Sequence, residues 1–356
     1  MGQILGLGIT HYPNLSAKRN MSWRTQRSLE DPALPEHLRR VENWHPTMRA
    51  QWGNDQGQAH SDQHRRDMIE QFRRIRAELD AFNPDFVVIW GDDQYENFRE
   101  DCVPAFSILA YDAVDIQPWK HYRRGPNAWD EPEEKTFTVR GHRAGGKYLA
   151  TALLEEGIDV AYAYRPLHHP LGHAFANSVL YLDYDRKGFH YPVVPFAVNA
   201  YGRWLIAANG APVSPSAGAQ LPPSEADLDP PAPQPWRCFQ VGAAVARALT
   251  RSPWRVAIIA SSSWSHSFLV RKHARLYPDV EADKYYYEAL KNGNWELWRN
   301  TTLAEVEERG HHELLNWFCL AGAMHELGRG KPDESVFLES WITNSDKVFA
   351  VYRPAG

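Results

Sequence analysis

Short apolar runs that are typical of strands alternate with stretches of helical period along this chain. The apolar runs cover residues 4–9, 86–90, 105–110, 160–164, 193–198, 256–260 and 348–352. Amphipathic stretches separate several of them, at residues 61–82, 143–156, 238–250 and 303–324. This alternation predicts an α/β fold with a central mixed β-sheet flanked by helices.

Two polar segments interrupt the alternation. Residues 14–58 are charged and irregular and contain several prolines, which is long for a plain connection and predicts a segment that covers a functional site. Residues 208–235 are rich in Pro, Ala and Ser and have no hydrophobic period, which predicts an extended surface insertion. Neither segment divides the apolar pattern in two, so we expect a single domain over residues 1–356.

The composition excludes several classes of partner. The 39 basic and 44 acidic residues give a net charge of -5, and the basic residues form no tract, so nucleic-acid binding is not expected. No window approaches the apolar length of a membrane span, and the first residues resemble no export signal. Cys102, Cys238 and Cys319 form no disulfide framework. We therefore expect a cytoplasmic protein.

Histidine and acidic residues follow several of the predicted strands. His11 comes directly after the first apolar run, Asp92 and Asp93 follow the second, and His266 lies just after residues 256–260. In α/β sheets the loops at the carboxyl ends of the strands form the site. A histidine held there by rigid backbone is suited to metal binding or acid/base work, although a hydrogen-bonded structural histidine remains the alternative.

Two further residues could take part in chemistry. Glu313 lies beside a strongly apolar helical stretch, where it is either an oxygen ligand or an ordinary paired carboxylate. One carboxylate and two imidazoles form the facial triad that leaves positions open on Fe(II). His173 follows a histidine-rich turn and could pass a proton to a bound phenolate, or could simply cap a helix.

The second imidazole is left open by the residues alone. His60 and His64 are four positions apart, a spacing that metal sites use, and Ser61 is a suitable N-cap for the helix expected over residues 61–82. The polar neighbours of His64 predict solvent exposure, whereas His60 would lie at the corner between loop and helix.

At this point the chain resembles a known family, the class III extradiol dioxygenases typified by the catalytic chain of protocatechuate 4,5-dioxygenase, and especially its gallate and 3-O-methylgallate relatives. The resemblance runs through Gly8-Ile-Thr-His11-Tyr-Pro13, Pro84-Asp-Phe-Val-Val-Ile-Trp-Gly-Asp-Asp-Gln94, Gly172-His-Ala-Phe175, Val193-Val-Pro-Phe-Ala-Val-Asn199, Val256-Ala-Ile-Ile-Ala-Ser-Ser-Ser-Trp-Ser-His266, Glu313-Leu-Leu-Asn-Trp317 and Ala321-Gly-Ala-Met324. No single piece is diagnostic, but their order and spacing are specific.

The resemblance implies a role for each candidate. It makes His11, His60 and Glu313 the metal ligands of an Fe(II) site, with His45 as the fallback for the second imidazole. It makes His266 the acid/base residue and His173 a histidine that contacts substrate. One departure is visible, because the family often has Asn-Asp-His after the second strand and this chain has Asp92-Asp93-Gln94. We expect that change to alter hydrogen bonding around the site without removing a ligand.

The implied activity is opening of a catechol-type or gallate-type aromatic ring with O2. A small aromatic compound is then the expected substrate, and a homodimer or a small separate partner subunit is compatible with the composition. Arg203 is a candidate partner for a substrate carboxylate. Two other classes compete: a zinc-dependent hydrolase or lyase on the same scaffold, and a non-catalytic binding protein.

Overall fold

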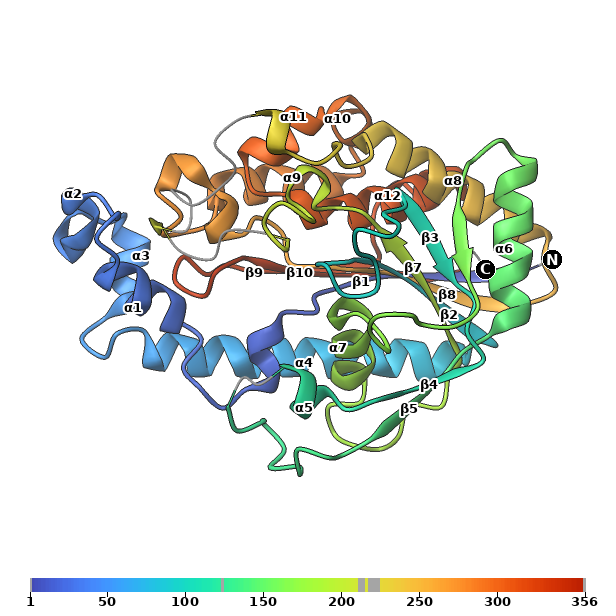
Figure 1. Ribbon diagram of the computed structural model, residues 1–356, viewed down its shortest axis with the longest axis horizontal. Helices are drawn as coiled ribbons and strands as arrows, with labels where there is room; N and C mark the ends of the chain where they lie inside the picture. The colour runs from blue at the N-terminus through green and yellow to red at the C-terminus, as the bar shows by residue number, and fades with distance from the viewer. Residues whose placement is uncertain (1, 123–124, 211–214, 217–224, 355–356) are drawn as a thin grey trace.

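A computed structural model describes residues 2–122, 125–210, 215–216 and 225–354 of the chain. Its centre is a mixed eight-stranded sheet with the order β6-β3-β7-β2-β8-β1-β10-β9 (Figure 1). The strands are β1 (Gln3–Ile9), β2 (Phe86–Asp92), β3 (Phe106–Leu109), β6 (Ala161–Ala163), β7 (Val193–Val198), β8 (Arg255–Ser261), β9 (Glu334–Leu338) and β10 (Lys347–Tyr352). A separate two-stranded sheet pairs β4 (Ala113–Ile116) with β5 (Phe137–Arg140).

The four middle strands are parallel, because β7 pairs with β2, β2 with β8, and β8 with β1 in the same direction. Their carboxyl ends therefore meet at one edge of the sheet. The outer strands β3 and β10 run antiparallel to this group. The expected central mixed sheet is confirmed, and the predicted bounds of the middle strands differ from the observed ones by at most two residues.

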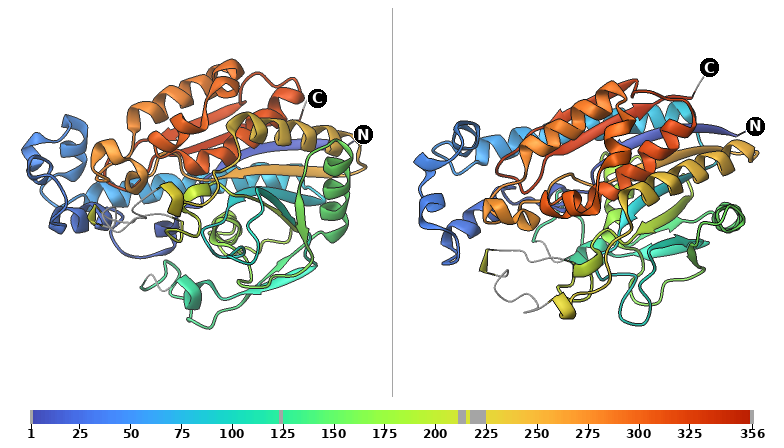
Figure 2. Two further views of the ribbon diagram at one scale, coloured as in Figure 1. Left: turned by 45° about the horizontal axis from the view of Figure 1, so that its top comes forward. Right: turned by 90° about the horizontal axis from the view of Figure 1, so that it is seen from above.

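Helices cover both faces of the sheet (Figures 1 and 2). The helices are α1 (Trp23–Glu30), α2 (Glu36–Arg39), α3 (Pro46–Trp52), α4 (Gln58–Phe82), α5 (Pro118–Tyr122), α6 (Arg143–Glu155), α7 (His173–Leu182), α8 (Pro235–Arg251), α9 (Val280–Asn292), α10 (Trp295–Asn300), α11 (Leu303–Glu308) and α12 (Leu315–Glu326). Side chains of α6, α8 and α12 pack on one face, and those of α4 and α7 pack on the other.

Alternate side chains of each central strand pack into one or the other of these two cores. In β8, Val256 and Ile258 join the core under α8 and α12, while Ala257 and Ile259 join the core under α4 and α7. This two-residue alternation is what a strand buried on both faces requires. Glycines let α8 and α12 approach closely, since a Cβ at Gly242 would lie 1.7 Å from the backbone oxygen of Cys319.

Two helix predictions need correction. The helix expected from Ser61 begins at Gln58, with Gly57 in a left-handed conformation before it, so His60 lies inside the first turn and Ser61 is not the N-cap. The stretch at residues 303–324 is two helices, because Gly310 has a φ of +68° and breaks the helical path. Glu313 lies in the short 3-10 helix His312–Leu314 between them.

The two polar segments have more structure than their composition suggests. Residues 14–58 include α1, α2 and α3, which lie at one end of the molecule in Figure 1, and their Trp44 and Trp52 pack with Trp341. The predicted insertion at 208–235 falls partly outside the described residues. Its described end is tied to the fold by Asp229, whose carboxylate accepts hydrogen bonds from the backbone of Ile206 and Ala207. Within the described chain, no helix is long and apolar enough to cross a membrane.

Candidate metal centre

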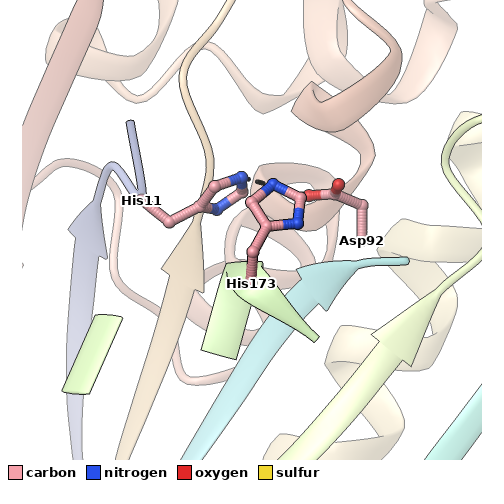
Figure 3. Close-up of side chains that lie close together, drawn as sticks. All are labelled: His11, Asp92 and His173. Carbon is pink, nitrogen blue, oxygen red and sulfur yellow. Dashed lines mark ion pairs between the residues drawn. The ribbon is translucent and has the colours of Figure 1, made fainter. Parts of the chain in front are cut away.

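Side chains from three different elements converge where β1 and β2 end. His11 follows β1, Asp92 is the last residue of β2, and His173 is the first residue of α7 (Figure 3). Among the described residues, one ligand atom from each of these three lies within 4.8 Å of the other two, and all three residues are buried. The strand-end argument from the sequence thus anticipated that His11 and Asp92 lie close together.

The tautomer of His11 follows from its hydrogen bond. Its Nδ1 lies 3.0 Å from the carbonyl oxygen of Ser261, and a carbonyl can only accept, so Nδ1 carries the proton. The lone pair of Nε2 then faces Asp92 Oδ1 at 3.5 Å and Glu313 Oε2 at 3.3 Å. A lone pair that faces two carboxylate oxygens is repelled unless a cation or a proton lies between them.

The two oxygens of the Glu313 carboxylate have different surroundings. Oε1 accepts a hydrogen bond from the hydroxyl of Tyr201 at 2.6 Å and from the amide of Gln94 at 3.3 Å, and it lies 3.3 Å from His266 Nε2. Oε2 is buried and has no hydrogen-bond partner among the described residues. Burial alone would raise the pKa of Glu313, but its interactions with the imidazoles of His266 and His11 and the hydrogen bond from Tyr201 outweigh burial and lower that pKa to about 2.

Asp92 is the second carboxylate of the cluster. Its Oδ1 lies 3.4 Å from the side-chain nitrogen of Asn316, and its buried Oδ2 has no hydrogen-bond partner among the described residues. Burial, together with the nearby charge of Glu313, raises the pKa of Asp92 to about 7. Two buried carboxylates with unpaired oxygens beside one imidazole form a donor set that suits a divalent cation.

His173 and His266 are held in defined orientations. His173 Nδ1 donates to Glu96 Oε2 at 2.8 Å, and its ring meets that of His11 edge-on with centroids 5.0 Å apart. His266 Nδ1 donates to the carbonyl of Trp264 at 2.8 Å, which turns the basic Nε2 toward Glu313. Burial lowers the pKa of His266 to about 4, so this ring is neutral and can accept a proton.

His60 is not brought into this cluster. Its Nε2 lies 3.0 Å from the hydroxyl of Ser340, and its ring stacks on that of His64 with centroids 5.7 Å apart. Burial lowers the pKa of His60 to about 4. The expectation that His64 faces solvent is wrong, because it is only 3% exposed. The fallback His45 is exposed, caps α3 and stacks on Trp341.

The sequence reasoning missed three contributors to the site. Gln94 was noted as a departure from the family, but its amide contacts Glu313, so the change falls within the site itself. Tyr201 and Glu96 carried no sequence signal beyond lying a few residues after β7 and β2. Arg203, the candidate partner for a substrate carboxylate, lies close enough to Glu307 for its charge to lower the pKa of that carboxyl.

A different arginine approaches the site from the covering segment. Arg24 of α1 places its guanidinium 4.9 Å from the ring centroid of Phe268, and that ring lies 5.2 Å from the ring of His266. Burial lowers the pKa of Arg24 to about 10, and its charge acts on Tyr12 and Tyr201. A partly buried cation near the site favours an anionic group close by.

Comparison with known proteins agrees with this fold and with a ring-opening dioxygenase. Residues 228–350 match a family described as the catalytic LigB subunit of aromatic ring-opening dioxygenase, so this part of the chain is similar to that family. That stretch contains Glu313 and His266. This match and the names of the relatives described next agree with the resemblance to class III extradiol dioxygenases.

Three relatives carry the name 2,3-dihydroxyphenylpropionate/2,3-dihydroxicinnamic acid 1,2-dioxygenase. The protein of Photorhabdus laumondii is 23% identical over 59% of this chain and 52% of its own length. A second form from Pseudomonas putida is 30% identical over 37% and 36%, and that of Paraburkholderia phymatum is 29% identical over 56% and 48%. The chain thus matches about half or less of the length of these relatives.

Proposed function

We propose that this protein is a ring-cleavage dioxygenase that binds Fe(II) and opens a catechol-type aromatic ring with O2. The observation that carries the proposal is the lone pair of His11 Nε2, which faces carboxylate oxygens of Asp92 and Glu313 at 3.5 and 3.3 Å. The LigB-family match and the names of the relatives support the reaction class.

We infer that His11, Asp92 and Glu313 hold the metal. His11 Nε2 lies within 3.5 Å of one oxygen of each carboxylate, and Asp92 Oδ2 and Glu313 Oε2 have no hydrogen-bond partner among the described residues. This geometry favours Asp92 over His60 as the third ligand. When bound there, Fe(II) would offer coordination positions to the catecholate oxygens and to O2 and would relay electrons from the catechol to O2.

Two histidines beside the proposed metal ligands, His266 and His173, accept and donate protons. His266 is neutral and its Nε2 is basic, so it accepts a proton from a substrate hydroxyl and can return it later in the reaction. His173 has its Nδ1 proton held by Glu96, which leaves Nε2 as the basic nitrogen of the ring. Tyr201 stays protonated, because burial and the charge of Glu313 raise its pKa well above the usual value, and it fixes the orientation of Glu313.

The substrate in this proposal is a catechol with an acidic substituent. The relatives are named for 2,3-dihydroxyphenylpropionate, and Arg24 lies one aromatic ring away from His266. A guanidinium pairs readily with a carboxylate in planar geometry. The free thiols Cys238 and Cys319 suit a reducing compartment such as the cytoplasm.

The test combines metal content with oxygen consumption. Protein purified without air is analysed for bound metals and then mixed with catechol, 2,3-dihydroxyphenylpropionate and gallate in an oxygen electrode. Near-stoichiometric iron and substrate-dependent oxygen uptake support ring cleavage. Bound zinc without oxygen uptake indicates a hydrolase or lyase on this scaffold, and the absence of bound metal in the purified and reconstituted protein indicates a binding role.

A further inference from the structure

A fully buried polar cluster adjoins the segments that carry two residues of the proposed site, His266 and Glu313. Its members are Ser265, Asp283, His311, Asp346 and Lys347, and each is 0% exposed. Buried charged and polar groups are costly unless they are paired, so such a cluster calls for an explanation. The cluster lies next to the site in sequence as well, since Ser265 precedes His266 and His311 is two residues before Glu313.

Asp283, in the first turn of α9, connects the two segments that carry these site residues. Its Oδ1 accepts the backbone N–H of Ser265 at 3.0 Å and the Nε2–H of His311 at 2.6 Å. Its Oδ2 accepts the hydroxyl of Ser265. One carboxylate is therefore bonded on one side to the loop of His266 and on the other side to the segment of Glu313.

Asp346 supplies the last bond to this carboxylate. The two carboxyl groups share a side-chain hydrogen bond, which requires that one of them keeps its proton. Burial raises the pKa of Asp283 to about 7, whereas burial and the charge of Asp283 raise the pKa of Asp346 well above its usual range. Three donors already point at Asp283, and Oδ2 of Asp346 accepts from no donor among the described residues, so we assign the proton to Asp346 and the acceptor role to Asp283.

The two segments that Asp283 joins also contact each other directly. The backbone N–H of His266 donates to the carbonyl of Gly310 at 3.0 Å. A Cβ at Gly310 would lie 3.0 Å from the carbonyl oxygen of His266, so the approach depends on glycine. This hydrogen bond joins the backbones of the two segments. Asp283 joins Ser265 of one segment to the side chain of His311 in the other.

We propose that Asp283 is a positioning residue that sets the placement of His266 relative to Glu313. It does so as the shared acceptor for Ser265, His311 and the protonated Asp346. The inference rests on the proposed function, in which His266 carries protons beside the metal ligand Glu313. In this proposal Asp283 accepts the shared hydrogen bond and Asp346 donates it. Isosteric Asn variants of the two residues should therefore have different effects.

In Asp283→Asn, one acceptor oxygen becomes an NH2 group that faces the donors Ser265 and His311. In Asp346→Asn, an amide N–H takes the place of the shared proton and still donates to Asp283. Glu288→Gln on the exposed surface of α9 is the matched control, because it makes the same chemical change on the same helix.

The first readout is steady-state oxygen uptake by the iron-loaded enzyme with a catechol. Because misplacement of a catalytic group by about 1 Å costs about 100-fold, we expect kcat of Asp283→Asn to fall by roughly that factor while KM changes by less than about 3-fold. Asp346→Asn and Glu288→Gln should keep kcat within about 3-fold of wild type. Equal losses in Asp283→Asn and Asp346→Asn, or a wild-type kcat in Asp283→Asn, would overturn the proposal.

The second readout needs no metal and no activity. In ¹⁵N-histidine-labelled metal-free protein, the proton on His311 Nε2 should give a downfield signal that Asp283→Asn removes and Asp346→Asn keeps. The ring signals of His266 should shift in Asp283→Asn only, and unchanged His266 signals in that variant would contradict the positioning role. If the wild-type enzyme consumes no oxygen with any catechol, the proposed function fails, but these spectra still decide the role of Asp283.

Discussion

His11 Nε2 lies 3.3 Å from Glu313 Oε2, while the other nitrogen of the same ring donates to the carbonyl of Ser261. The ring thus points a lone pair at a carboxylate oxygen that has no hydrogen-bond partner among the described residues. A cation between the two groups would be attracted to both the lone pair and the carboxylate oxygen, so the pair is suited to metal binding.

The first prediction concerns the third metal ligand. Asp92→Asn should weaken Fe(II) binding by at least about 10-fold, because it removes a charged oxygen 3.5 Å from His11 Nε2. His60→Ala should leave the affinity within about 3-fold of wild type, because His60 bonds to Ser340 instead. Competition titration with a coloured chelator measures both. The opposite order of effects would make His60 the ligand and would require its helix end to move on metal binding.

Sequence reasoning predicted a candidate site at the ends of the strands. His11 and His266 follow strands of the parallel group and Asp92 ends one, and the sheet brings such ends together whatever the loops do. It could not show that Gln94 turns toward Glu313 or that Tyr201 reaches the same oxygen, because those contacts depend on side-chain directions within loops. The same limit explains His64, whose polar neighbours suggested exposure although its own side chain is buried.

The second prediction follows from the position of Gln94. Its amide lies 3.3 Å from Glu313 Oε1. At this sequence position the class III extradiol dioxygenases, which the chain resembles, often have histidine. Gln94→His puts a second imidazole beside His11 and Glu313, which completes a set of two histidines and a carboxylate. We expect Fe(II) affinity to rise by about 10-fold.

Gln94→Ala is the matched control for this change, because it removes the amide without adding a ligand. A Gln94→His variant that binds Fe(II) no better than Gln94→Ala would show that the residue at this position cannot reach the metal.

The third prediction tests recognition of an acidic substituent. Arg24→Gln should raise KM for 2,3-dihydroxyphenylpropionate by about 10-fold or more, since a charged hydrogen bond contributes about 1.5–3 kcal/mol. KM for uncharged catechol should stay nearly constant, because it offers no carboxylate to the guanidinium. Oxygen uptake at fixed iron content measures both substrates.

Arg27→Gln serves as the control, because Arg27 lies exposed on the same helix. An equal loss with both substrates in Arg24→Gln would indicate that Arg24 supports the packing of α1 against Phe268 and does not select the substrate.

The fourth prediction concerns stability at acid pH and lies away from the site. His142 caps α6, where its Nδ1 accepts the backbone N–H of Gly145 at 3.0 Å, and its ring stacks on Phe86. Burial lowers the pKa of His142 below the value of 6.5. As the pH falls through 6.5, the unfolded chain therefore binds a proton before the folded chain does, and stability is lost until the pH passes the folded pKa.

His142→Asn keeps an acceptor at the N-cap but has no ring nitrogen to protonate. Urea unfolding at pH 7.5 and pH 5 should show a smaller loss of unfolding free energy for this variant than for wild type. Because other buried histidines contribute to both proteins equally, the difference between the two pH dependences isolates His142. Parallel pH profiles would mean that protonation of His142 costs the folded state nothing, and that the cap of α6 does not depend on the Nδ1 lone pair.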